Sequence, residues 1–120
     1  MNPAPGFKKR PEHRIVTKPA ENRVQASVNG EVIADSKNAI VMEEGNYAPV
    51  FYFPRNDVKM DRLVRSHLST YCPFKGDAAY FSLKGGAENA VWTYEHPYDE
   101  MAVIKERLAF YPNRVEIKEL

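Results

Sequence analysis

The sequence has little cysteine, no long apolar run and almost no net charge. A single cysteine, Cys72, excludes an internal disulfide and is typical of a reducing compartment, so we expect a cytoplasmic protein. No apolar run approaches a membrane span, and no apolar segment follows the basic residues 8–10, so we expect neither a membrane segment nor a secretory signal. With 17 Lys and Arg against 16 Asp and Glu, the net charge of +1 argues against general binding to nucleic acid.

The sequence also lacks the common motifs for cofactors. It has no glycine-rich phosphate loop and no Walker-type Gly-Lys-Ser/Thr. His13, His67 and His96 are scattered without the spacing of metal ligands, and the five-residue separation of His67 and Cys72 is a weak signal for a metal site. We therefore predict no metal, and the cofactor, if any, is unknown from the sequence.

What the sequence does contain is a series of short strands. With 120 residues and 43% hydrophobic residues it suits one soluble domain with a real core. Residues 1–21 hold four prolines among basic residues and are expected to form an extended arm, with Ile15 and Val16 as possible anchors. Residues 22–120 are expected to form a single β-rich domain.

Turn residues divide this domain. Asn29-Gly30 predicts a type I′ hairpin between residues 24–28 and 31–35, with Ala26 opposite Ile33. A strand at about 38–43 would extend it to a meander, and Pro49 and Pro54 bound a fourth strand. Residues 99–108 show helical spacing, and Pro112-Asn113 suggests a closing hairpin. The pattern predicts a compact antiparallel sandwich or open barrel of about eight short strands, with one or two short helices.

A central hairpin spans residues 67–83. Pro73 ends its first strand and Gly76 closes the turn, which holds Lys75 three residues from the Cys72 thiol. An ammonium near a thiol favours the nucleophilic thiolate, so Cys72 and Lys75 are candidate catalytic residues. The alternative is that Cys72 is a small buried hydrophobe and Lys75 a solvated turn residue.

Several motifs resemble one known family. They are the run at 50–58, the Cys-Pro-Phe-Lys-Gly-Asp-Ala-Ala-Tyr run at 72–80 and the Asn-Ala-Val-Trp-Thr-Tyr run at 89–94. Together they resemble domain of unknown function 427, also labelled nucleotidyltransferase-like, over about residues 22–118. The resemblance implies a small, single-domain, β-rich protein without an established reaction. The nucleotidyltransferase label is not carried over, because the sequence lacks the paired carboxylates and phosphate-holding loop that such enzymes need.

Aromatic residues alternate along the predicted strands and suggest a binding site. Tyr52, Tyr80, Trp92 and Tyr94 could line one pocket beside Cys72 and Lys75, because Tyr and Trp combine an apolar ring with a polar tip. Arg55 could bind a carboxylate or phosphate there. The alternative is that these rings form the core.

Two function classes follow from this ambiguity. The leading hypothesis is a small-molecule-binding domain, with enzyme activity left open. Glu43 and Glu44 end a strand with opposite side-chain directions, and either could act as a general base or be a solvated strand end. The competing class is a non-catalytic structural or protein-interaction module, for example a homodimer.

Overall fold

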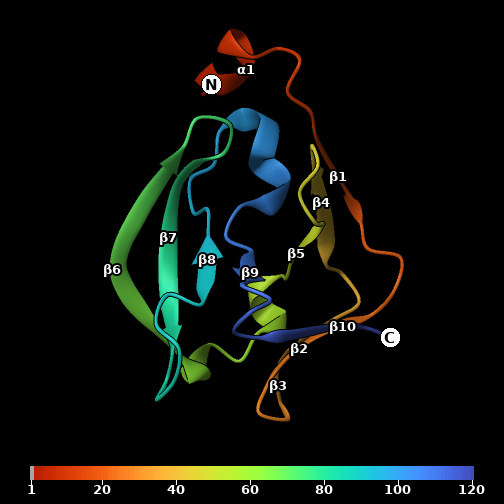
Figure 1. The fold of residues 1–120 in the computed structure, drawn as a ribbon, viewed down its shortest axis with the longest axis vertical. Coiled ribbons are helices and arrows are strands. Elements are labelled where there is room, and N and C mark those ends of the chain that lie inside the picture. The colour runs from red at the N-terminus through yellow and green to blue at the C-terminus, as the bar shows by residue number, and fades with distance from the viewer. Residues whose placement is uncertain (1) are drawn as a thin grey trace.

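The computed structural model describes residues 2–120, which form ten strands in three antiparallel sheets (Figure 1). The first sheet has the order β1 (Ile15–Pro19), β4 (Ile40–Glu44), β5 (Val50–Tyr52). The second has the order β10 (Glu116–Glu119), β2 (Val24–Val28), β3 (Glu31–Ser36). The third has the order β6 (Leu63–Cys72), β7 (Gly76–Leu83), β8 (Val91–Thr93), β9 (Leu108–Phe110). The prediction of a mainly β, antiparallel fold is confirmed; the sheets curve without closing into a barrel.

Helix is a minor component of the described residues. It comprises the short α1 (Pro5–Lys9) and 3-10 segments at Arg55–Asp57, Met60–Arg62 and Asp99–Ile104. The helix predicted for 99–108 is therefore shorter and tighter than expected, since the chain leaves it after Ile104 and enters β9 at Leu108. Within residues 2–120, no helix has the length and apolar character needed to cross a bilayer.

The first hairpin forms at the predicted turn, with Asn29 and Gly30 at φ 50° and 83° and Val28 opposite Glu31. Its register differs from the simple expectation, because a bulge between Ala26 and Ser27 places Ala26 opposite Ala34 and not Ile33. Such a bulge adds one residue to a strand and increases its local twist. Turn chemistry therefore located the hairpin, whereas the bulge had no sequence signal.

Long-range pairing differs from two sequence predictions. The predicted meander is wrong, since β4 pairs with β1 and β5 and lies in a different sheet from β3. The predicted closing hairpin is also wrong, since β9 pairs with β8 while β10 pairs with β2. Strands β4 and β10 thus pair with strands that are distant in the sequence, β1 and β2.

The N-terminal stretch that was expected to be an arm contributes regular structure. Strand β1 pairs along its length with β4, from Ile15 opposite Glu44 to Pro19 opposite Ile40. Helix α1 sits on the β6–β7 turn, where the Gly6 N–H donates to the Pro73 carbonyl over 2.9 Å. A side chain at Gly6 would collide with the Phe74 ring, since a Cβ there would lie 2.6 Å from it. Glycine at this position therefore permits the close approach.

A single residue pair joins the first and third sheets into one curved wall. Just after β5, Phe53 donates its N–H to the Leu108 carbonyl (2.8 Å) and accepts the Leu108 N–H in return (2.9 Å). Both residues are 0% exposed, and the Phe53 ring packs edge-on against Phe110 with centroids 5.4 Å apart. The wall therefore runs from β6 through β7, β8, β9, β5 and β4 to β1.

The wall separates two hydrophobic clusters, because successive residues of a strand point to opposite faces. Phe53 and Phe81 belong to the first cluster, which the β10–β2–β3 sheet covers, whereas their neighbours Tyr52 and Tyr80 belong to the second. The second cluster also contains Met42, Tyr94 and Ala109, and the half-buried Trp92 packs against it. The predicted alternation thus sends Tyr52 and Tyr80 to the second cluster and the residues next to them, Phe53 and Phe81, to the first.

Replacing Phe53 with alanine tests this junction. We expect Phe53→Ala to lower the free energy of unfolding by about 3–5 kcal/mol, because it removes a fully buried ring and leaves a cavity. Urea unfolding of both proteins measures the difference. The control Tyr47→Ala removes a ring that is 75% exposed and should cost less than about 0.5 kcal/mol. Equal losses for the two variants would contradict the assigned role of Phe53.

Candidate functional site

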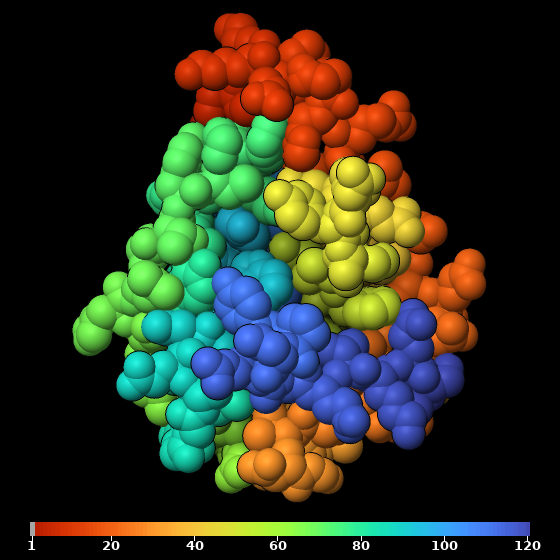
Figure 2. All heavy atoms as spheres, in the orientation of Figure 1, coloured from red at the N-terminus to blue at the C-terminus, as the bar shows by residue number. Residues whose placement is uncertain are grey.

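A hollow opens on the face of the wall that carries the second cluster. Figure 2 shows it framed by the β4–β5 loop in yellow, the β6–β7 hairpin in green and the segment after β9 in blue. The cavity has a volume of about 220 Å³. Its lining residues are Met42, Glu44, Tyr47, Ala48, Val50, Tyr52, Lys75, Tyr80, Trp92, Tyr94 and Tyr111.

The floor of the hollow is a row of side chains across adjacent strands. Tyr80 lies opposite Trp92, and Trp92 opposite Ala109. The Phe53–Leu108 pair then places Tyr52 opposite Ala109 in the same antiparallel register. Ala109 is the one small side chain between Trp92 and Tyr52, and the Trp92 ring reaches across it to the Tyr52 hydroxyl. Four of the predicted binding residues, Tyr52, Tyr80, Trp92 and Tyr94, therefore meet at this hollow.

The polar tips of these rings are held differently. The Trp92 Nε1–H donates to the Tyr52 hydroxyl oxygen over 3.3 Å, and the Tyr80 hydroxyl is hydrogen-bonded to Thr70 Oγ1 over 3.0 Å. The Tyr94 side chain is 7% exposed, and its hydroxyl has no hydrogen-bond partner among residues 2–120. Burial raises the pKa values of Tyr52 and Tyr94, so both phenols remain protonated at neutral pH.

One ion pair lies in the wall of the hollow. Lys75 Nζ donates to Glu44 Oε1 over 2.7 Å, and these side chains are only 13% and 17% exposed. His13 Nε2 lies 2.8 Å from the other carboxylate oxygen, Oε2. Burial by itself would raise the Glu44 pKa, but the hydrogen bonds from Lys75 and His13 outweigh it, and the pKa is lowered. Glu44 is therefore a carboxylate with both oxygens engaged.

The turn that carries Lys75 is braced from outside. The Lys75 N–H donates to the Cys72 carbonyl over 3.2 Å, and Gly76 follows at φ 116°. The neighbouring Phe74 ring stacks on His13, with centroids 4.1 Å apart, and meets Phe7 edge-on at 5.0 Å. The N-terminal segment therefore clamps the turn and positions His13 behind Glu44.

Cys72 lies beside the hollow without lining it. Its half-buried side chain packs against the second hydrophobic cluster. The Lys75 ammonium, which the sequence had suggested as its activator, is hydrogen-bonded to Glu44. Activation of the Cys72 thiol by Lys75 stays a prediction.

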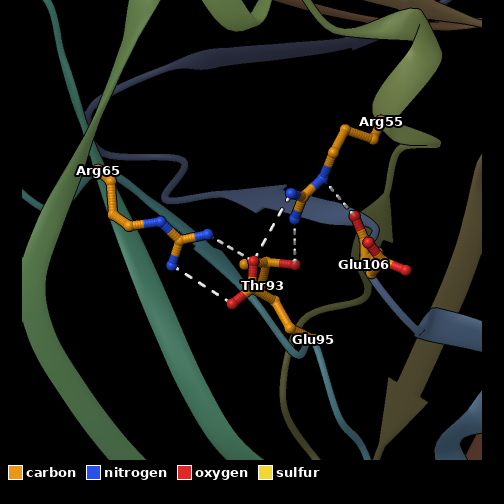
Figure 3. A network of polar contacts seen from close by, with 5 residues as sticks. All are labelled: Arg55, Arg65, Thr93, Glu95 and Glu106. Carbon is orange, nitrogen blue, oxygen red and sulfur yellow. Dashed lines mark hydrogen bonds and ion pairs between the residues drawn. The ribbon is translucent and has the colours of Figure 1, made fainter.

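Arg55 belongs to a second polar cluster, away from the lining residues of the hollow (Figure 3). Its guanidinium donates to the Glu106 carbonyl (3.0 Å) and to Thr93 Oγ1 (3.2 Å), and it lies 3.6 Å from Glu95. Arg65 also donates to Glu95, and this hydrogen bond lowers the carboxyl pKa. The Arg55 charge is thus engaged by the protein itself.

Sequence reasoning missed several parts of the hollow. Tyr47 and Tyr111 were not assigned to a site, His13 was considered only as a metal ligand, and Glu44 was left open as a base or a solvated strand end. Strand alternation placed Glu44 on the face of Met42, but only the β1–β4 pairing and the position of the β6–β7 turn bring His13 and Lys75 to it. Within residues 2–120, no three His, Cys, Asp or Glu side chains are grouped to hold a metal ion.

Comparison with known proteins identifies a family but no function. A family model described as a domain of unknown function (DUF427) matches residues 16–119. No curated protein matches the sequence. The match covers nearly all strands that form the hollow, and it confirms the resemblance noted in the sequence.

The Glu44 ion pair predicts a pH dependence of stability. Because the folded pKa of Glu44 is lowered, its contribution is complete above about pH 4.3, the unperturbed value, and is lost as the pH falls through the folded pKa. Glu44→Gln should therefore lower the free energy of unfolding by about 1 kcal/mol at pH 7, with a smaller difference in acid. Urea unfolding from pH 3 to pH 7, in steps of about half a unit, measures this.

The neighbouring residue supplies a matched control. Glu43 is exposed and lies 3.8 Å from Lys18, so Glu43→Gln should change stability by less than about 0.5 kcal/mol at every pH. A pH profile of Glu44→Gln that runs parallel to the wild-type profile would show that Glu44 has an ordinary pKa in the folded protein.

Proposed function

The chain belongs to the DUF427 family, and we propose that it binds a small molecule in the hollow between the β4–β5 loop and the β6–β7 turn. One observation carries the proposal. Six aromatic residues and a shielded ion pair from four strands and four connecting segments converge on a space that they leave unfilled. A core would fill this space, since protein interiors pack with few voids.

The size of the hollow restricts the ligand. A volume of about 220 Å³ lies below the range of about 300–1,000 Å³ that is typical of sites for drug-sized ligands. A compact metabolite with one ring is therefore the best fit. The proposed contacts are Tyr52, Tyr80, Trp92, Tyr94 and Lys75.

A blocking substitution tests this proposal. Ala48 lies exposed at the rim, so Ala48→Trp should fill the hollow and leave both cores intact. We expect a metabolite thermal-shift screen to find at least one compound that raises the Tm of the wild-type protein and not of this variant, because a ligand specific to the folded state must stabilise it. The matched control Ala102→Trp, on the exposed side of the Asp99–Ile104 segment, should respond like the wild type. Shifts that persist in Ala48→Trp would place binding elsewhere.

Catalysis at this site is a further hypothesis, with Cys72 as nucleophile and Lys75 as the group that activates its thiol. Its test is the rate of iodoacetamide alkylation against pH. Lys75→Met leaves the Glu44 carboxylate without its ammonium, so the local potential becomes more negative and alkylation near neutral pH should slow several-fold. The double variant Lys75→Met/Glu44→Gln removes both charges and should recover most of the rate. Identical profiles for all three proteins would exclude a role of Lys75 in thiol activation.

The alternative, an interaction module, has its own support in the edge strand β6. Val64, Leu68 and Tyr71 are large apolar side chains of β6 that are 48%, 42% and 57% exposed. Among residues 2–120 the strand is paired only with β7, so its other edge is open to another chain. Docking there would leave the hollow free, and a failed ligand screen would favour this function.

A further inference from the structure

The hydrogen-bonding groups around the hollow are unbalanced. Tyr52 accepts the Trp92 N–H, so its own O–H proton is directed elsewhere, and no acceptor for it is found among residues 2–120. The Tyr94 hydroxyl also has neither a donor nor an acceptor partner among these residues. Lys75 donates one of its three N–H groups to Glu44. The hollow therefore offers several unused donors.

The strongest acceptor, in contrast, is already engaged. Glu44 is the only carboxylate among the lining residues, and its two oxygens face Lys75 and His13. The Tyr80 oxygen is paired with Thr70. A ligand that brings an acceptor complements these donors, since a donor that the ligand covers without a partner costs about 1–3 kcal/mol.

The charges favour a neutral acceptor. Lys75 is the only cation among the lining residues, and its charge is balanced by Glu44 at 2.7 Å. A ligand carboxylate beside Lys75 would meet the Glu44 carboxylate as well, and its desolvation would not be offset by a free positive charge. A carbonyl oxygen accepts hydrogen bonds from the same donors without the cost of desolvating a charge.

The walls favour a flat ring. Trp92 is half-buried, and its ring packs at 4.5 Å against Tyr111 on one side of the hollow. Tyr52 meets the Trp92 ring edge-on at 6.3 Å, so the two rings form a corner. Aromatic surfaces of this kind take up planar rings in stacked or edge-to-face contact.

We propose that the hollow selects a neutral planar ring that carries a carbonyl oxygen, with the Tyr94 hydroxyl as a donor to that oxygen. This inference rests on the proposed ligand binding and specifies its chemical class. The Tyr94 hydroxyl is the determinant because its residue lines the space and no hydrogen bond within the described chain engages it.

Three benzene derivatives of similar size test the class: benzamide (neutral carbonyl), benzoate (anion) and benzylamine (cation and donor). Trp92 is the single tryptophan and lines the hollow, so quenching of its fluorescence reports occupancy directly. We expect benzamide to bind at least tenfold more tightly than the other two. Cyclohexanecarboxamide, which keeps the carbonyl and loses the planar ring, should bind more weakly than benzamide.

The variant Tyr94→Phe tests the determinant. It keeps the ring and removes a hydroxyl without protein partners, so the fold should be retained while benzamide affinity falls about tenfold, the equivalent of one hydrogen bond. The control Tyr98→Phe removes a hydroxyl bonded to Tyr71 outside the hollow and should leave the affinity within twofold.

The outcomes separate the class from the function. Benzoate or benzylamine binding as tightly as benzamide, or Tyr94→Phe without effect, would overturn the assigned class. If none of the probes quenches Trp92 while another compound gives a thermal shift that Ala48→Trp abolishes, the class is wrong and ligand binding stands. If no compound of either kind gives a response, both proposals fail.

Discussion

The Phe53–Leu108 pair is the constraint on which the arrangement of this protein depends. Two reciprocal backbone hydrogen bonds join a three-stranded sheet to a four-stranded one, and both residues are fully buried. Since side chains alternate along a strand, the register of this one pair directs Phe53 and Leu108 to the first core and Tyr52 and Ala109 to the other face. A shift by one residue would exchange the cores and remove the hollow.

The hollow lies where large side chains of several strands meet on the face that carries the second cluster. Tyr80, Trp92 and Tyr52 line it, and the Trp92 ring reaches across the small Ala109 to the Tyr52 hydroxyl. The rim is closed by the Glu44–Lys75 ion pair, which links β4 to the β6–β7 turn. An ion pair of this kind adds little to stability once desolvation is included, but it fixes the relative position of the two elements. The main effect of the ion pair is therefore to hold β4 and the β6–β7 turn in place.

The N-terminal segment gives the site a second layer. Phe7 and His13 pack on Phe74, and His13 engages the oxygen of Glu44 that Lys75 leaves. Residues that precede the matched family region thus complete the polar wall. On the opposite side, Arg55 and Arg65 compensate Glu95 and lie over the Phe81 ring, which accounts for two basic residues without assigning them a ligand.

Sequence by itself determined the local features: the β class, the Asn29-Gly30 turn, the central hairpin, and the alternation that sets Tyr52, Tyr80, Trp92 and Tyr94 on one set of faces. These follow from short-range physics, namely backbone sterics at turns and the two-residue period of strands. Outside these two hairpins, tertiary structure alone decided which strands pair, so it overturned the meander and the closing hairpin. It also separated Arg55 from the aromatic residues of the hollow. It also brought together His13, Glu44 and Lys75, which are 31 residues apart at each step. Such contacts depend on the burial of whole strand faces, a property of the complete chain that no local pattern encodes.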